Sequence, residues 1–190
     1  GRPRSGVLWF GATTGDQLPG QTAWIGLRSQ IETSLGPAFA GNLRAGDVVM
    51  TLDRGPQILR AVTPLSLPAR GSYAPVLLRA PYFGQMRDLL VSADQRVAIS
   101  GPEAEYLFDA ESVLMPAGAL VDGRTALADD RRAVTGSVAL DLGGPALIES
   151  DGCILALGHD AARDLPLRAI KPYEVLTLMS LLGRAPRAAA

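Results

Sequence analysis

Between Ile25 and Ala156 the chain alternates short apolar runs with turns rich in glycine, proline and polar residues. In the stretch DVVMTLDRGPQILRAV, apolar positions on either side of DRGP predict a β-hairpin. Further strands are predicted over PVLLRAP, DLLVSA, RVAIS, SVLMP, SVALDL, PALIES and CILAL. So many short strands separated by turn residues predict a mostly-β domain.

The stretch KPYEVLTLMSLLG, residues 171–183, breaks the strand pattern and predicts a C-terminal α-helix. Pro172 suits a first helical turn and Gly183 suits a helix end. Its apolar residues fall on two faces, with Tyr173, Leu176 and Met179 on one and Val175, Leu178 and Leu182 on the other. A helix that is apolar most of the way round is expected to pack on the domain or on a partner.

These patterns divide the chain into an N-terminal arm over 1–24, a β domain over 25–170, the helix over 171–183 and a tail over 184–190. The β domain contains a faint internal echo. The stretches LRAGDVV (43–49) and MPAGALV (115–121) share an Ala-Gly pair and each precedes further strands. The echo suggests two similar β subunits related by a pseudo-twofold axis.

The amino-acid composition argues against a nucleic acid as a partner and against a membrane span in this chain. The 190 residues are 47% hydrophobic and 19% charged, which is enough apolar material for one well-packed domain. The net charge of −1 gives no electrostatic footprint for a nucleic acid. No apolar run approaches the roughly 18–20 residues of a membrane span, and no signal peptide is recognisable, which favours the cytoplasm.

Conventional catalytic and metal motifs are sparse. Cys153, the single cysteine, opens an apolar strand and is expected to be a small buried residue rather than a reactive thiol. His159, the single histidine, is expected in an exposed loop. One cysteine and one histidine do not suffice for a structural zinc site. No phosphate loop, dinucleotide fingerprint or nucleophile elbow occurs, and EAEY and ADDRR are interpreted as solvated turns, so no cofactor is expected.

Several stretches nevertheless stand in a recognisable order. IETSLGPAFAGNLRAGDVVMTLDRGPQILRAV is followed by RDLLVSADQRV, VLMPAGALVDGRT, VALDLGGPALIESDG and IKPYEV. This order resembles the Hint (hedgehog/intein) superfamily, and specifically its bacterial stand-alone Hint-domain proteins, over about residues 25–175. The resemblance implies a compact all-β Hint fold and a self-cleaving chemistry. In that chemistry a cysteine attacks the carbonyl before it, and a histidine in a Thr/Ser-x-x-His block assists the leaving amide nitrogen.

Both reactive groups are replaced when the family pattern is carried onto this chain. The nucleophile position falls on Trp24, which has neither sulfur nor hydroxyl, and the histidine position falls on Gln95, whose amide delivers no proton near neutral pH. Ser92 keeps the hydroxyl of the block. Thr22 and Ser29 are the alternative hydroxyl nucleophiles close to the expected position.

The leading hypothesis is a degenerate, non-catalytic Hint domain, a pseudoenzyme that serves as a structural or binding module for a protein partner not identifiable from the sequence. In this hypothesis Trp24, Ser92 and Gln95 border one vestigial site. The first alternative is active self-cleavage through a hydroxyl nucleophile. The second alternative is an unrelated β-rich assembly protein.

Overall fold

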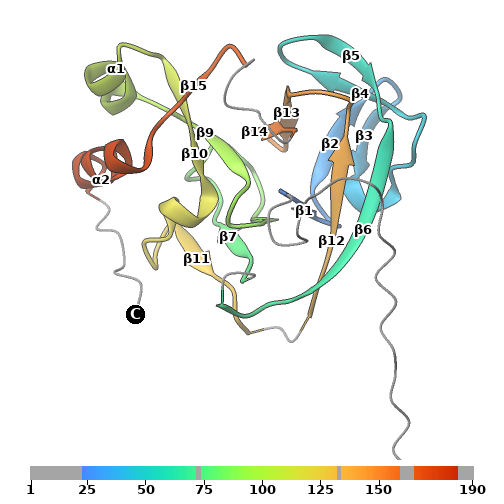
Figure 1. The fold of residues 1–190 in the computed structure, drawn as a ribbon, viewed down its shortest axis with the longest axis horizontal. Helices are drawn as coiled ribbons and strands as arrows, with labels where there is room; N and C mark the ends of the chain where they lie inside the picture. Colours follow the sequence, from blue (N-terminus) through green and yellow to red (C-terminus); the bar gives the residue numbers. More distant parts are fainter. Residues whose placement is uncertain (1–22, 72–73, 132–133, 159–164, 184–190) are drawn as a thin grey trace, which may run out of the picture.

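The computed structural model describes residues 23–71, 74–131, 134–158 and 165–183. Within them the chain is mostly β, with two α-helices and two short 3-10 helices (Figure 1). The strands are β1 (Ile25–Gly26), β2 (Gln30–Thr33), β3 (Gly36–Phe39), β4 (Val48–Thr51), β5 (Gly55–Ile58), β6 (Ala61–Pro68), β7 (Val76–Leu78), β8 (Leu89–Val91), β9 (Arg96–Ser100), β10 (Ser112–Pro116), β11 (Ala126–Ala128), β12 (Val134–Asp141), β13 (Ala146–Ser150), β14 (Cys153–Leu157) and β15 (Arg168–Ala169). The helices are η1 (Ala40–Asn42), α1 (Pro102–Phe108), η3 (Ala117–Leu120) and α2 (Pro172–Leu181).

The strands form two sheets. The six-stranded sheet has the order β11-β7-β8-β1-β12-β6. The nine-stranded sheet has the order β15-β10-β9-β14-β13-β4-β2-β3, with β5 attached to β4. The predicted hairpin is present as β4 and β5, in which Val48 pairs with Ile58. The mostly-β fold expected from the sequence is therefore confirmed.

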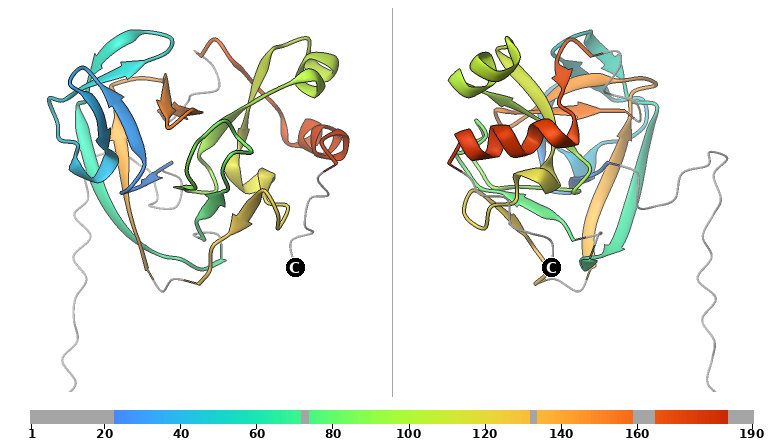
Figure 2. Two further views of the ribbon diagram at one scale, coloured as in Figure 1. Left: turned by 180° about the vertical axis from the view of Figure 1, so that it is seen from behind. Right: turned by 60° about the vertical axis from the view of Figure 1, so that its left-hand side comes forward.

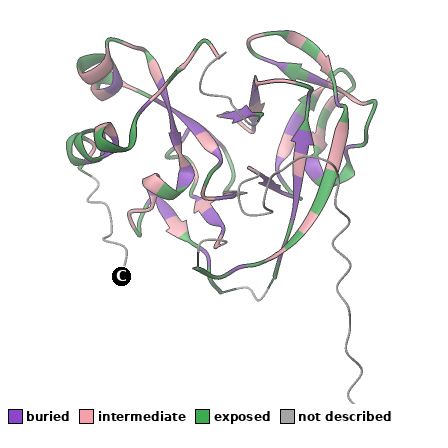
Figure 3. Ribbon diagram, viewed as in Figure 1, coloured by how far each residue is buried: buried purple, intermediate pink, exposed green. Residues whose placement is uncertain are grey.

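The apolar residues of both sheets meet in one large core cluster, which also includes Leu178 of α2 (Figure 3). The buried positions Val97, Val113 and Leu155 come from three neighbouring strands and are 0% exposed. Since all three sit in the apolar runs that predict strands, those runs locate the core correctly.

The C-terminal helix lies where the sequence predicts it, next to a shorter helix that the sequence analysis missed. Helices α1 and α2 pack together on one side of the molecule, opposite β4, β5 and β6 (Figure 2). Helix α1 contains EAEY, which was expected as a solvated turn. Pro102 at its start was the available signal, but seven residues are too few for a helical period to show.

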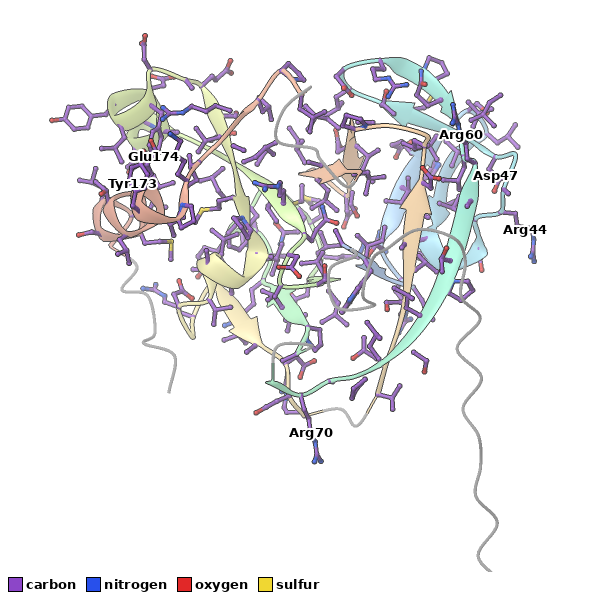
Figure 4. The ribbon with its side chains drawn as sticks, viewed as in Figure 1. Arg44, Asp47, Arg60, Arg70, Tyr173 and Glu174 are labelled. Carbon is purple, nitrogen blue, oxygen red and sulfur yellow. The ribbon has the colours of Figure 1, made fainter. Side chains whose placement is uncertain are left out.

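Helix α2 begins with a capping arrangement. Glu174 accepts the backbone N–H of Lys171 at 2.7 Å and forms an ion pair with Arg168. Figure 4 shows Tyr173 and Glu174 side by side at this helix start. No helix among the described residues is long and apolar enough to cross a membrane.

A rough twofold relation links the first and second halves of the chain. Strands β1 and β8 pair antiparallel at the centre of the six-stranded sheet, where Ile25 faces Val91. The turns that follow these strands repeat the same hydrogen bond. Ser29 N–H donates to the Gly26 carbonyl at 3.0 Å, and in the second half Gln95 N–H donates to the Ser92 carbonyl at 3.1 Å.

The repeat continues into the 3-10 helices. The Ser29 carbonyl accepts the N–H of Ala40 at 2.8 Å, just as the Gln95 carbonyl accepts the N–H of Ala117 at 2.8 Å. This register differs from the echo seen in the sequence, which paired Ala45 rather than Ala40 with Ala117. The physical reason is that the Ala45-Gly46 pair lies in an open turn, where a side chain on the glycine would meet nothing within 4 Å.

The predicted arm and tail lie almost wholly outside the described residues. The structure begins at residue 23, so only the last two positions of the arm are described, and it ends at residue 183.

Candidate functional site

Trp24 and Ser92 lie 68 positions apart in the sequence and bind each other directly. The backbone N–H of Trp24 donates to Ser92 Oγ at 3.1 Å, and the backbone N–H of Ser92 donates to the Trp24 carbonyl at 3.0 Å. Both residues are buried, at 4% and 6% exposure. The peptide nitrogen held by Ser92 belongs to the Ala23–Trp24 bond, the bond that the family pattern would place at the cleavage point.

The sheet explains this contact. Trp24 immediately precedes β1 and Ser92 immediately follows β8, and the antiparallel pair Ile25–Val91 fixes their neighbours opposite one another. In such a pair the residue before one strand and the residue after the other are adjacent. The pairing of β1 with β8 is therefore sufficient to place Ser92 next to the backbone of Trp24.

Gln95 joins the same cluster through the backbone turn from Ser92, and its side chain is fully buried. Its Nε2 donates to the carbonyl of Ala156 at 2.7 Å and to that of Arg96 at 3.0 Å. Both partners are acceptors, so the nitrogen must face them. Gln95 Oε1 is then left buried without a hydrogen-bond partner among the described residues.

The structure thus brings Trp24, Ser92 and Gln95 together, and their chemistry is that of hydrogen bonding. The Gln95 amide has no proton to transfer near neutral pH, and the indole of Trp24 is no nucleophile. The hydroxyl of Ser92 accepts from a backbone N–H. None of these three side chains is hydrogen-bonded to a general base among the residues described.

Ser29, one of the two alternative nucleophiles, stands apart from this cluster. Ser29 is 5% exposed, and its Oγ has no hydrogen-bond partner in the described part of the chain. A serine nucleophile needs a base within hydrogen-bond reach, and Ser29 has none there. Ser29 instead lines a separate pocket together with Ser150 and Arg87. Thr22 lies outside the described residues.

Cys153 is confirmed as a core residue. It is 0% exposed at the start of β14, and burial raises the pKa of its thiol to about 12. A thiol with this pKa is protonated at neutral pH and is a poor nucleophile. His159 lies outside the described residues, and within the described ranges no cluster of three or more His, Cys, Asp or Glu side chains is placed to hold a metal ion.

The Ala156 carbonyl is the partner of Gln95 that sequence reasoning missed. It is a backbone group on β14, which pairs with β9 through Ala156 and Arg96. A backbone acceptor has no signature in side-chain patterns, so no motif could have located it. Only the pairing of strands 61 positions apart creates the contact.

Comparison with known families settles the resemblance. The family described as Hint domain matches residues 27–155, more than half of the chain. The chain belongs to the Hint-domain family. The match covers Ser92 and Gln95 of this Hint domain and begins three positions after Trp24.

Solved structures with a similar fold are inteins and an intein-like domain. The gp41-1 intein shares 9% identity at a TM-score of 0.45, covering 70% of this chain and 97% of the intein. The MchDnaB-1 intein shares 13% identity at a TM-score of 0.46, covering 70% and 99%. The bacterial intein-like domain from Clostridium thermocellum shares 13% identity at a TM-score of 0.45, covering 70% and 97%. No curated protein sequence matches the chain.

Proposed function

We propose that this Hint domain is a degenerate, non-catalytic member of its family that acts as a structural or binding module. The observation that carries the proposal is the pairing of Trp24 with the Ser92–Gln95 corner. At this corner the two positions that the family uses for its nucleophile and its acid hold an indole and an amide.

The contacts of Gln95 support a structural role. Burying a side-chain amide is costly unless it is hydrogen-bonded. Here the amide nitrogen joins β14 to the start of β9 through the carbonyls of Ala156 and Arg96. Ser92 similarly ties the backbone of Trp24 to the end of β8. The residues that would run the chemistry in an active relative therefore serve to hold strands together.

The experiment is a search for self-cleavage. A precursor carrying the natural residues upstream of the domain is incubated with a thiol or with hydroxylamine, which intercept thioesters and esters, and is weighed by mass spectrometry. We expect the precursor to stay intact over time.

A pair of fragments separated near residues 21–29 would contradict the proposal and favour self-cleavage through a hydroxyl. The variants Thr22→Ala and Ser29→Ala then identify the nucleophile, because only the variant that lacks it stops cleavage. Ser92→Ala serves as a control for loss of the corner's hydrogen bond, since it leaves both alternative nucleophiles in place.

A further inference from the structure

The twofold relation gives the Ser92–Gln95 corner a counterpart at Gly26–Ser29. Ser29 occupies the position of Gln95, because both make the same turn and both accept the N–H of an alanine in a 3-10 helix. The two side chains also share an unusual property. Ser29 Oγ and Gln95 Oε1 are both buried without a hydrogen-bond partner among the described residues.

The Gly26–Ser29 turn differs from the Ser92–Gln95 corner because it borders a pocket of about 270 Å³. The pocket is lined by Ser29 from the first turn, by Ser150 at the end of β13, by Leu89 at the start of β8 and by Arg87 two residues before that strand. Phe39, at the end of β3, forms an apolar rim and is 43% exposed. The lining thus combines two apolar side chains with several polar and charged groups, which can fix the orientation of a small ligand.

We propose that this pocket binds a zwitterionic amino acid with an apolar side chain. The proposal does not depend on whether the domain cleaves itself, since ligand binding and cleavage are read by different measurements.

Hydrogen-bond donors left over in the pocket fit a carboxylate. Arg87 uses Nε and Nη2 for Asp151 and Gln30, which leaves Nη1 without a partner among the described residues. Arg28 lines the same pocket, is exposed, and has no partner in the described part of the chain. Guanidinium groups match the two oxygens of a carboxylate in geometry as well as charge.

The two serine hydroxyls add further donors. Ser29 is 5% exposed and Ser150 is 0% exposed, and neither Oγ has a partner among the residues described. A buried unpaired hydroxyl is costly, so a ligand oxygen that pairs with it is favoured. Both hydroxyl oxygens are buried in this structure, so pairing with a ligand requires each serine to change χ1 to another of its three staggered positions.

The charges of the lining fit a zwitterion better than a simple anion. Arg87 is neutralised by Asp151 at 2.9 Å, which leaves Arg28 and Asp88 as the unmatched charges of the pocket. Of the two carboxylate oxygens of Asp88, Oδ1 accepts a hydrogen bond from the backbone N–H of Ala80 at 2.9 Å, and Oδ2 has no hydrogen-bond partner among the described residues. A ligand with one carboxylate and one ammonium complements both. Its apolar side chain would contact Phe39 and Leu89.

The test is a titration of isotope-labelled protein with L-leucine, followed by NMR. We expect saturable shifts at the amides of Gln30, Leu89 and Asp151, at millimolar concentrations or below. N-acetyl-L-leucine lacks the ammonium and L-leucinamide lacks the carboxylate, and each should bind more weakly than leucine. In the dipeptide leucyl-leucine the ammonium and the carboxylate lie further apart than in leucine. Comparing the two ligands therefore distinguishes a free amino acid from a peptide source.

Variants locate the binding at the pocket. Ser29→Ala and Ser150→Ala should each raise the Kd for leucine at least about tenfold, because a hydrogen bond to a charged group is lost. Arg28→Gln and Asp88→Asn should raise it about two- to fivefold, because these charges are exposed. Thr135→Val is the matched control, since the Thr135 hydroxyl is also buried without a partner among the described residues but lies outside this pocket.

None of the three hydroxyl variants should lower the melting temperature of the parent protein, because none removes a protein hydrogen bond. Loss of leucine shifts in a folded Ser29→Ala or Ser150→Ala protein therefore supports the proposal. Absence of shifts up to tens of millimolar leucine overturns it. Equal binding of leucine and its two blocked forms, or unchanged binding in both serine variants, also overturns it.

Discussion

At the scale of single residues, the two halves of the Hint domain differ in how a buried polar side chain at equivalent positions is hydrogen-bonded. Gln95 satisfies its amide nitrogen on two carbonyls, whereas the Ser29 hydroxyl has no protein partner among the described residues. The sequence singled out Gln95 because it falls on the histidine position of the family pattern, and Ser29 because it is a hydroxyl close to the expected nucleophile position. It could not tell which of them faces strand β14 and which borders a pocket, since those surroundings come from strands distant in the chain.

Cys153 provides a residue-scale prediction about pH. Burial raises the pKa of its thiol from the ordinary value of 9.0 to about 12. Between these values the unfolded chain releases a proton that the folded chain keeps, so the free energy of unfolding falls as the pH rises. Relative to Cys153→Ala, the free energy of unfolding of the parent protein should fall by about 1.4 kcal/mol for each pH unit between these two pKa values. Urea unfolding of both proteins measures this difference.

The comparison with Cys153→Ala isolates the thiol, because every other pH-dependent contribution to the free energy of unfolding is common to both proteins and cancels in the difference. At neutral pH the substitution should cost about 1 kcal/mol, as expected for a small buried side chain. Rapid alkylation of the native thiol at neutral pH would contradict its burial.

At the scale of elements, sequence patterns located nine of the fifteen strands in the described part of the chain and missed β1, β2, β3, β6, β11 and β15, of which β6 is the longest. Its sequence, AVTPLSLP, contains Pro64 and Pro68, which argue against a central strand. The structure resolves the conflict by placing β6 at the edge of the six-stranded sheet, where β12 is its one partner among the described residues. A proline lacks the N–H that a ladder requires, so these prolines fit the free edge and protect it from pairing with other chains.

Replacing both prolines tests that protection. The double variant Pro64→Thr/Pro68→Thr should restore two edge N–H groups and promote self-association, which analytical ultracentrifugation over a concentration series would detect. Ser66→Thr, on the same strand, changes a side chain without adding an N–H and should leave the association state of the parent protein unchanged. A double variant indistinguishable from Ser66→Thr would show that the prolines do not guard the edge.

For helix α2, the apolar pattern predicts where the helix lies but not which of its faces is buried. The sequence predicted its position and an apolar face formed by Val175, Leu178 and Leu182. It grouped Met179 with Tyr173 and Leu176 on a second face. In the structure Met179 is buried, while Tyr173 and Leu176 are 67% and 59% exposed. Which side of an all-round apolar helix is buried depends on what it packs against, and the contact with α1 is a tertiary feature.

A matched pair of leucines on α2 measures its docking. Leu178 is 0% exposed and Leu176 is 59% exposed, two positions away on the same helix. Leu178→Ala should cost about 2–5 kcal/mol of unfolding free energy, and Leu176→Ala should change it by less than about 0.5 kcal/mol. Deleting residues 171–190 should promote aggregation, because it uncovers the core surface that Leu178 contacts. Equal costs for the two leucines would show that the helix is peripheral.

At the scale of the whole molecule, the twofold relation makes the two halves comparable position by position. Gly41 and Gly118 are equivalent, since their N–H groups donate to the carbonyls of Leu27 and Ala93 at 2.9 and 2.8 Å. A Cβ on Gly41 would lie 3.1 Å from the Leu27 carbonyl oxygen, and one on Gly118 would lie 3.3 Å from that of Ala93. These approaches are tighter than nine in ten real Cβ contacts, and because the oxygens belong to the backbone, it is the backbone that has to give by a few tenths of an ångström.

Gly41→Ala and Gly118→Ala should therefore destabilise the protein by similar amounts, about 1–3 kcal/mol each. Gly144→Ala is the control, because the nearest atom to its added Cβ is the flexible guanidinium of Arg54 at 3.2 Å, which can move away. Denaturant unfolding of the three variants provides the comparison. If the twofold relation is structural, the first two variants lose stability together and the third does not. A large loss in only one of Gly41 and Gly118 would show that the halves share hydrogen bonds without sharing packing, and it would remove the basis for treating Ser29 as the counterpart of Gln95.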